Sequence, residues 1–129
     1  MFQRDYMLRM IEAVAQAIGR VMRLLAQKKP DEAEQALAEA YNGLSIDKEL
    51  LLMLDGRSLR AHFGEPDKLV LAARVLICDA EVQLHKAELR AAAKRLKAAQ
   101  RLLTEHGAPP AEVSAELARV HEALASRSA

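Results

Sequence analysis

Three side chains that could bind a metal ion or form a nucleophile recur along one stretch of the sequence. Cys78, Glu81 and His85 are separated by three and four residues, which places them on one face of a helix. A thiol, a carboxylate and an imidazole arranged in this way could hold a metal or activate the thiol. One cysteine and one histidine are too few ligands on their own, and no second pair with zinc-like spacing occurs. We therefore predict no metal site and no cofactor.

No other pattern predicts catalysis. Cys78 lies among apolar neighbours, whereas a reactive thiolate needs an exposed and electropositive site. The serines form no nucleophile motif, and the remaining histidines are isolated in the sequence: His62, His106 and His121. We therefore predict that the protein is not an enzyme and has no catalytic residues. A small enzyme or ligand-binding helical bundle that uses Glu81 and His85 is the less favoured alternative.

Four residues on one side of the same stretch are candidates for a protein-binding groove. They are Arg74, Ile77, Glu81 and His85. Polar groups along one side of an otherwise apolar helix need partners, which a bound protein or peptide could supply. The alternative is that these groups line a solvated edge or pair locally, as Arg74 and Glu81 could across two helical turns.

Charged residues of opposite sign gather in two other stretches. The most basic face of the chain is predicted to consist of Lys86, Arg90, Lys94, Lys97 and Arg101. It could bind phosphates or an acidic partner, or it could be an ordinary solvated face. Nucleic acid is not expected, because no aromatic residues or glycine-rich loop interleave with it. Residues 31–49 are acidic, which would suit head-to-tail or two-fold self-association.

Composition indicates one domain, residues 1–129. The 19 basic and 18 acidic residues leave a net charge of +1, so no global field favours polyanions or an anionic membrane. A chain of this length can bury a core without disulfides or metal. The single cysteine suits a reducing compartment, and we find no targeting or membrane-spanning segment, so we expect a cytoplasmic protein.

The pattern of apolar residues and helix breakers predicts an all-α protein. A long N-terminal helix is predicted over 2–28, followed by helices over 30–42 and 48–54 and by at most two turns over 58–63. Residues 67–106 contain no glycine or proline. Over residues 66–106 we favour two helices with a split near Ala87 over one long helix. A final amphipathic helix follows residues 107–110 and would cap the domain.

Residues 69–78 form the most apolar stretch, since nine of the ten side chains are apolar and only Arg74 interrupts them. A helix that is apolar nearly all round must be buried on most sides. Charged residues bound this apolar stretch at both ends, with Asp79 and Glu81 at its C-terminal end. Arg74 must then either reach a groove or form an ion pair with a carboxylate inside the fold. Glu81 is the nearest candidate for such an ion pair.

A repeated pattern of small residues suggests two related helical hairpins. The alanine, leucine, alanine pattern of the second helix recurs with the same spacing further on, at Ala33, Leu37 and Ala40 and at Ala92, Leu96 and Ala99. Residues 28–33 resemble the turn and second-helix start of a tetratricopeptide repeat. We therefore predict a tetratricopeptide-like arrangement of antiparallel hairpins. The alternative is that an alanine-rich bundle yields the pattern by chance.

The first twelve residues carry a second resemblance, through Met1, Phe2, Gln3, Arg4, Asp5 and Tyr6 and then Arg9, Met10, Ile11 and Glu12. They resemble the start of a bacterial family of uncharacterised tetratricopeptide-like proteins. In that family a long N-terminal helix leads into a helical-repeat body, and no catalytic residue is established. The resemblance implies that fold and adds no activity.

Together these patterns favour a non-enzymatic protein-interaction module that binds a protein or peptide segment. The alternative is a self-associating structural protein. In that case the apolar face of the first helix would close a homodimer through Met10, Val14, Ile18, Met22 and Leu25.

Overall fold

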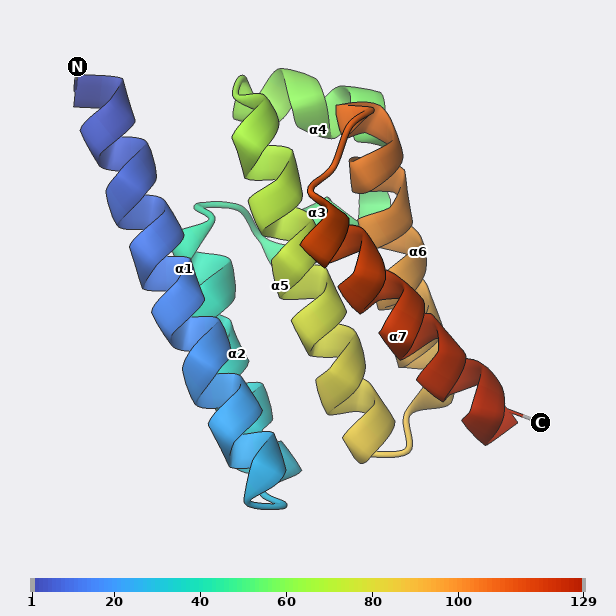
Figure 1. Ribbon diagram of the computed structural model, residues 1–129. Coiled ribbons are helices and arrows are strands. Elements are labelled where there is room, and N and C mark those ends of the chain that lie inside the picture. Colours follow the sequence, from blue (N-terminus) through green and yellow to red (C-terminus); the bar gives the residue numbers. More distant parts are fainter. Residues whose placement is uncertain (1, 129) are drawn as a thin grey trace.

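The computed structural model describes residues 2–128, and side chains from residue 5 onward. This part of the chain is all-helical and contains no strand (Figure 1). Its seven helices are α1 (Phe2–Ala26), α2 (Pro30–Gly43), α3 (Lys48–Met53), α4 (Gly56–Phe63), α5 (Pro66–His85), α6 (Leu89–His106) and α7 (Ala111–Ser128). In the described part, none of these helices combines the length and the apolar character needed to cross a bilayer.

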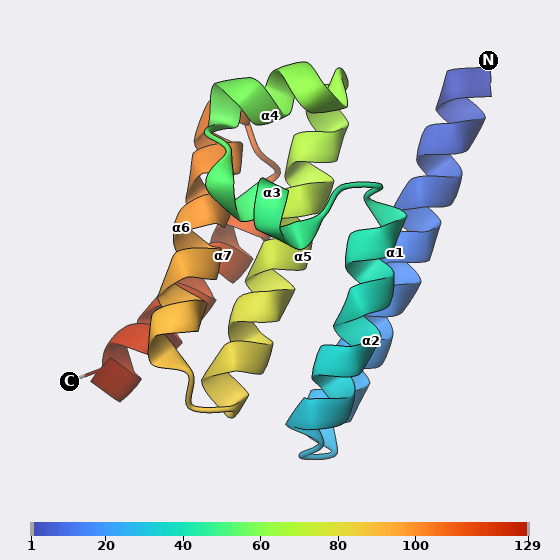
Figure 2. The ribbon, with the colours of Figure 1, turned by 180° about the vertical axis from the view of Figure 1, so that it is seen from behind.

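Two helical hairpins form the body of the molecule. The α1–α2 hairpin and the α5–α6 hairpin each join two antiparallel helices by a short turn, and α5 lies in the centre (Figure 1). Helix α7 crosses the front of α5 and α6, whereas α2, α3 and α6 lie on the opposite side (Figure 2). The predicted final helix is therefore confirmed, with Val113, Leu117 and Val120 buried against the second hairpin.

Helix α5 is the buried centre that its composition predicts. Nearly all of residues 69–78 are buried, and Arg74 is the one exposed side chain among them. Asp79 and Glu81 end the apolar stretch but not the helix. The helix continues to His85, and both carboxyl groups lie inside the fold rather than at its edge.

The predicted split of residues 66–106 near Ala87 is confirmed, and its turn repeats the geometry of the first hairpin. Lys28 and Ala87 adopt the left-handed conformation, with φ of 60° and 62°. In both turns the amide of the next residue donates to a carbonyl five residues earlier, from Lys29 to Leu24 and from Glu88 to Gln83. This is the Schellman pattern, which ends a helix and reverses the chain.

The equivalence continues along both hairpins at a constant sequence offset. Both copies of the alanine, leucine, alanine pattern are fully or almost fully buried, at Ala33, Leu37, Ala40, Ala92, Leu96 and Ala99. Small side chains at these positions let the two helices of each hairpin approach closely. The two hairpins thus use the same positions for the turn and for packing.

Between the hairpins, α4 begins earlier than predicted. It begins at Gly56 rather than at residue 58, because Asp55 caps it by accepting a hydrogen bond from the Ser58 amide at 2.7 Å. Gly56 fits closely against α6, since a Cβ there would lie 3.0 Å from the carbonyl oxygen of Arg101. This contact seats α4 on the second hairpin.

A buried carboxylate joins the two hairpins. Asp79 of α5 accepts hydrogen bonds from Tyr41 of α2 at 2.5 Å and from Arg95 of α6 at 2.9 Å. Its other oxygen accepts from Gln83 at 3.0 Å. No buried side-chain nitrogen or oxygen in the described residues lacks a partner. Asp79 therefore ties three helices through one fully satisfied group.

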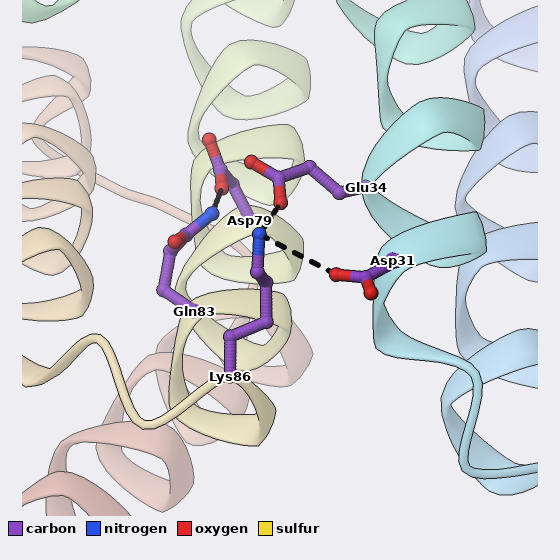
Figure 3. Close-up of polar contacts among 5 residues, drawn as sticks. All are labelled: Asp31, Glu34, Asp79, Gln83 and Lys86. Atoms are coloured by element: carbon purple, nitrogen blue, oxygen red, sulfur yellow. Dashed lines mark hydrogen bonds and ion pairs between the residues drawn. The ribbon is translucent and has the colours of Figure 1, made fainter.

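A second polar tie lies nearer the surface (Figure 3). Lys86, at the C-terminal end of α5, forms ion pairs with Glu34 and, at 3.7 Å, with Asp31 of α2. The hydrogen bond from Lys86 lowers the pKa of Glu34. The contact fixes the lower ends of the two hairpins against each other.

The turn geometry predicts that Ala87→Gly stabilises the protein. A left-handed residue other than glycine costs about 1 kcal/mol, which the substitution relieves. Ala93→Gly on the exposed face of α6 is the matched control, and it should destabilise by about 1 kcal/mol because it adds glycine to a helix interior. Chemical denaturation measures both. Equal destabilisation by the two substitutions would contradict the turn assignment.

We also predict that Asp79→Asn lowers the free energy of unfolding by about 3 kcal/mol. The substitution leaves the Arg95 guanidinium largely buried without its counter-ion. Tyr41→Phe should cost about 1 kcal/mol, since it removes one hydrogen bond. Asp31→Asn, at an exposed carboxylate, should change stability by less than about 0.5 kcal/mol. A similarly small decrease in the free energy of unfolding for all three variants would show that Asp79 does not hold the two hairpins together.

Candidate binding groove

A groove of about 420 Å³ opens on the front of the molecule, between α1, α5 and α7. Much of its lining is apolar, from Ile18, Met22, Val70, Ile77 and Val113. The polar groups that line it are Arg74, Glu81, Glu112 and Glu116. An apolar surface with a few polar groups is the usual composition of a binding site.

The first helices of the two hairpins contribute equivalent positions to this groove. Ile18 of α1 corresponds to Ile77 of α5 at the offset that relates the hairpins, and Met22 corresponds to Glu81. Helix α7 supplies the third wall through Val113 and Glu116. The groove is therefore a product of the repeated hairpin geometry together with the final helix.

Two carboxyl groups share one guanidinium at the edge of the groove. Arg119 of α7 forms ion pairs with Glu81 of α5 and with Glu116, the latter at 2.6 Å. Burial, reinforced by a hydrogen bond with Glu116, raises the pKa of Glu81 to about 7. The hydrogen bond from Arg119 lowers the pKa of Glu116. Because one cation cannot fully compensate two carboxylates, the more buried Glu81 holds a proton more strongly.

Three of the four residues predicted to form a groove line this one. Arg74, Ile77 and Glu81 lie along it, whereas His85 does not. His85 lies in a separate small cavity of about 180 Å³ between α5 and α7, which it shares with Glu81 and Arg119. The structure thus places Arg74, Ile77 and Glu81 along one groove. His85 lies outside it, beyond the pair formed by Glu81 and Glu116.

Arg74 reaches the groove, which was one of its two predicted roles. The other, an ion pair with Glu81, is not formed, because Arg119 takes that place. Within residues 5–128 no carboxylate oxygen lies within 4.0 Å of the Arg74 guanidinium. Its charge therefore remains available on the groove wall.

Cys78 also lines the groove, but its side chain is buried. Burial raises the pKa of its thiol to about 12, so the thiol is protonated at neutral pH. In the described part of the chain no group of three or more histidine, cysteine, aspartate or glutamate side chains is placed to hold a metal.

The predicted dimer face of α1 is used largely within the single chain. Met10, Val14 and Leu25 are buried. Ile18 and Met22 are half-buried in the groove. A homodimer through this face stays a prediction, with only these two side chains partly accessible.

Four of the five residues predicted to form the basic face are exposed on a single helix. Arg90, Lys94, Lys97 and Arg101 are exposed on α6. Lys86 instead follows the last residue of α5 and forms ion pairs with α2. Sequence reasoning missed Glu112, Glu116 and Arg119, because only the apolar side of the final helix was considered. The one-turn spacing of the two glutamates was the available signal.

Comparisons with protein-family models, curated proteins and solved structures found no match to this chain. The resemblance of its opening residues to a tetratricopeptide-like family therefore stays a prediction. Met1 and the side chains of residues 2–4, which carry part of that resemblance, lie outside the described residues.

The carboxyl pair predicts a specific pH dependence of stability. Because the pKa of Glu81 is raised from 4.5 in the fold, the folded protein binds a proton that the unfolded chain releases. This contribution is complete below pH 4.5 and is lost as the pH rises through 7. Between about pH 7.5 and 5.5 it should add on the order of 1 kcal/mol to the free energy of unfolding.

Glu81→Gln should remove that contribution, so the difference between wild type and variant should change with pH. Chemical denaturation of wild type and variant at both pH values measures this difference. Glu112→Gln, at an exposed carboxylate on the same groove, should retain the pH dependence of wild type. A parallel pH profile for wild type and Glu81→Gln would contradict the assignment.

Proposed function

We propose that this chain is a tetratricopeptide-like interaction module that binds a short protein segment in the groove between α1, α5 and α7. The observation that carries the proposal is that equivalent positions of the two hairpins, Ile18 and Ile77, face the same groove. In helical-repeat proteins the repeated hairpins create a concave surface for binding. The repeated turn and the repeated alanine pattern support the same interpretation.

The groove chemistry indicates what such a segment carries. A volume of about 420 Å³ accommodates a few side chains, and Ile77, Val70 and Val113 favour apolar ones. Arg74 supplies a guanidinium that has no carboxylate within 4.0 Å among residues 5–128, which suits a carboxylate on the segment. The proposed ligand is therefore a short peptide with an apolar anchor and an acidic group beside it.

The proposal assigns no reaction to the groove. Glu81 is engaged by Arg119 and Glu116, and the Cys78 thiol is buried. We propose that these groups shape the groove and its charge. The single buried cysteine also supports a cytoplasmic setting for the module.

Selection of short random peptides against the immobilised protein tests the proposal. Peptides selected on wild type should bind Arg74→Glu at least about tenfold more weakly, since the substitution replaces an attractive charge with a repulsive one. Ile18→Glu should weaken the same peptides by placing a charge on the apolar wall. Both residues are at least partly accessible, so folding should survive, which circular dichroism verifies.

Lys94→Glu on the far side of the molecule is the matched control and should leave peptide binding unchanged. Selection of no peptide above background would overturn the proposal. So would selected peptides that bind both groove variants as well as wild type.

A further inference from the structure

Helix α7 is attached to the rest of the molecule over a narrow surface. It crosses the front of α5 and α6 (Figure 1), and of its residues 111–128 only Val113, Leu117 and Val120 are buried. Space lies along both of its edges. The groove of about 420 Å³ lies on the side of α1, and a second cavity of about 650 Å³ lies on the side of α6. Few packing contacts therefore oppose a movement of this helix.

The connection between α6 and α7 is built as a hinge. Gly107 adopts the left-handed conformation, with φ of 87°, and its amide donates to the carbonyl of Leu103 at 3.1 Å, which ends α6. Pro109 and Pro110 follow, and neither has an amide hydrogen to donate. The hydrogen bonds of α7 then begin within the helix itself, from the amide of Val113 to the carbonyl of Pro110. Helix α7 is therefore able to move as a unit while the hydrogen bonds of α6 stay intact.

Two arginines of α7 bind α5. Arg127 donates to the carbonyl of Leu84 at 2.8 Å, and Arg119 forms the ion pair with Glu81. Arg119 also pairs with Glu116 of its own helix. When α7 moves away, Arg119 and Glu116 leave together and keep their ion pair, whereas Glu81 stays on α5. The movement therefore changes the surroundings of Glu81 most.

The charge balance at this contact depends on one proton. When Glu81 is protonated, the Arg119 guanidinium faces a single carboxylate, that of Glu116, and the two carboxyl groups share a hydrogen bond. When Glu81 is ionised, two carboxylates share one guanidinium in a buried place. Burial raises the pKa of Glu81 to about 7 while α7 is docked, and contact with water removes that cause. Docking of α7 therefore binds a proton, and undocking releases it.

Other charged and titratable groups also line the two cavities around Glu81. On α7 they are Glu112, Glu116, Arg119 and Arg127, and on α5 they are Arg74, Cys78 and His85. Helix α1 contributes the apolar side chains of Ile18 and Met22. The arginines stay charged at neutral pH, the thiol stays protonated, and Arg119 lowers the pKa of Glu116, which therefore stays ionised. Variants of Glu112 and His85 serve as controls below.

We propose that α7 is a proton-sensitive latch on the groove, docked on α5 when Glu81 is protonated and released more readily when Glu81 is ionised. Docking is strongest below pH 4.5, weakens as the pH rises from 4.5 to 7, and changes little above 7. Because α7 supplies the third wall, its release opens the groove. The control of ligand binding by this latch rests on the proposed function, whereas the movement itself does not.

Hydrogen exchange followed by mass spectrometry, without peptide, tests the latch. Amides of α7 should exchange faster than amides of α5 and α6, because α7 detaches while the hairpin stays folded. After correction for the intrinsic rates, the protection of α7 should fall at least about tenfold between about pH 5.5 and 7.5. Equal protection of α7, α5 and α6 would overturn the proposal, since α7 would then open only with the whole domain. So would a protection of α7 that is the same at both pH values.

Glu81→Gln should abolish the pH response of α7, because the side chain no longer ionises. His85→Asn and Glu112→Gln change exposed residues around the same contact and should keep the response of wild type. A response that persists in Glu81→Gln, or one that is lost in His85→Asn, would overturn the assignment to Glu81. Circular dichroism verifies that the variants fold.

The effect on the groove is measured separately, with a peptide selected on wild type. The peptide should dissociate more slowly at about pH 5.5 than at 7.5 from wild type, but equally fast at both from Glu81→Gln. Equal dissociation from wild type at both pH values, with a normal response in hydrogen exchange, would overturn control of the groove by the latch. Failure to select any peptide would overturn the proposed function and leave the latch standing on hydrogen exchange alone.

Discussion

The two hairpins are held together through the carboxylate of Asp79. A charge in the most buried helix is costly unless it is fully satisfied, and here Tyr41, Gln83 and Arg95 satisfy it. These donors come from α2, α5 and α6, so the group is satisfied only when both hairpins are in place. Apolar packing alone is tolerant of small slips, whereas this arrangement of donors fixes one register. The same register positions α1 and α5, the first helices of the two hairpins, which form two of the three walls of the groove.

Local signals in the sequence were sufficient to predict most of the fold. Proline at the starts of α2 and α5, the apolar run over 69–78 and the break near Ala87 each act within a few residues, and each was predicted correctly. Asp55 shows where such signals are ambiguous, because an aspartate before glycine can end one helix or cap the next. Asp79 could not be predicted, since the donors that make its burial acceptable are Tyr41 and Arg95, which come from distant parts of the chain.

The groove was predictable in part for a related reason. Arg74, Ile77 and Glu81 share one helix face, so their spacing alone groups them correctly. Spacing gives no information on which other helices stand opposite, and this is why Glu116 and Arg119 were missed. It also fails to show where a groove ends. His85 continues the same face by one turn, but α7 crosses between it and the groove with Arg119 bound to Glu81.

Asp79 and Glu81 show how one helix can serve both the fold and a binding surface. Two residues apart on a helix, they point in nearly opposite directions, toward α2 and α6 in one case and toward α7 in the other. Asp79 has a complete set of donors and is closed to solvent, so no further group can bind it. Glu81 shares Arg119 with Glu116 and faces the groove. Its charge therefore responds to pH and to a ligand that enters the groove. The same buried helix therefore presents a fixed side, which sets the architecture, and an adjustable side, which suits recognition.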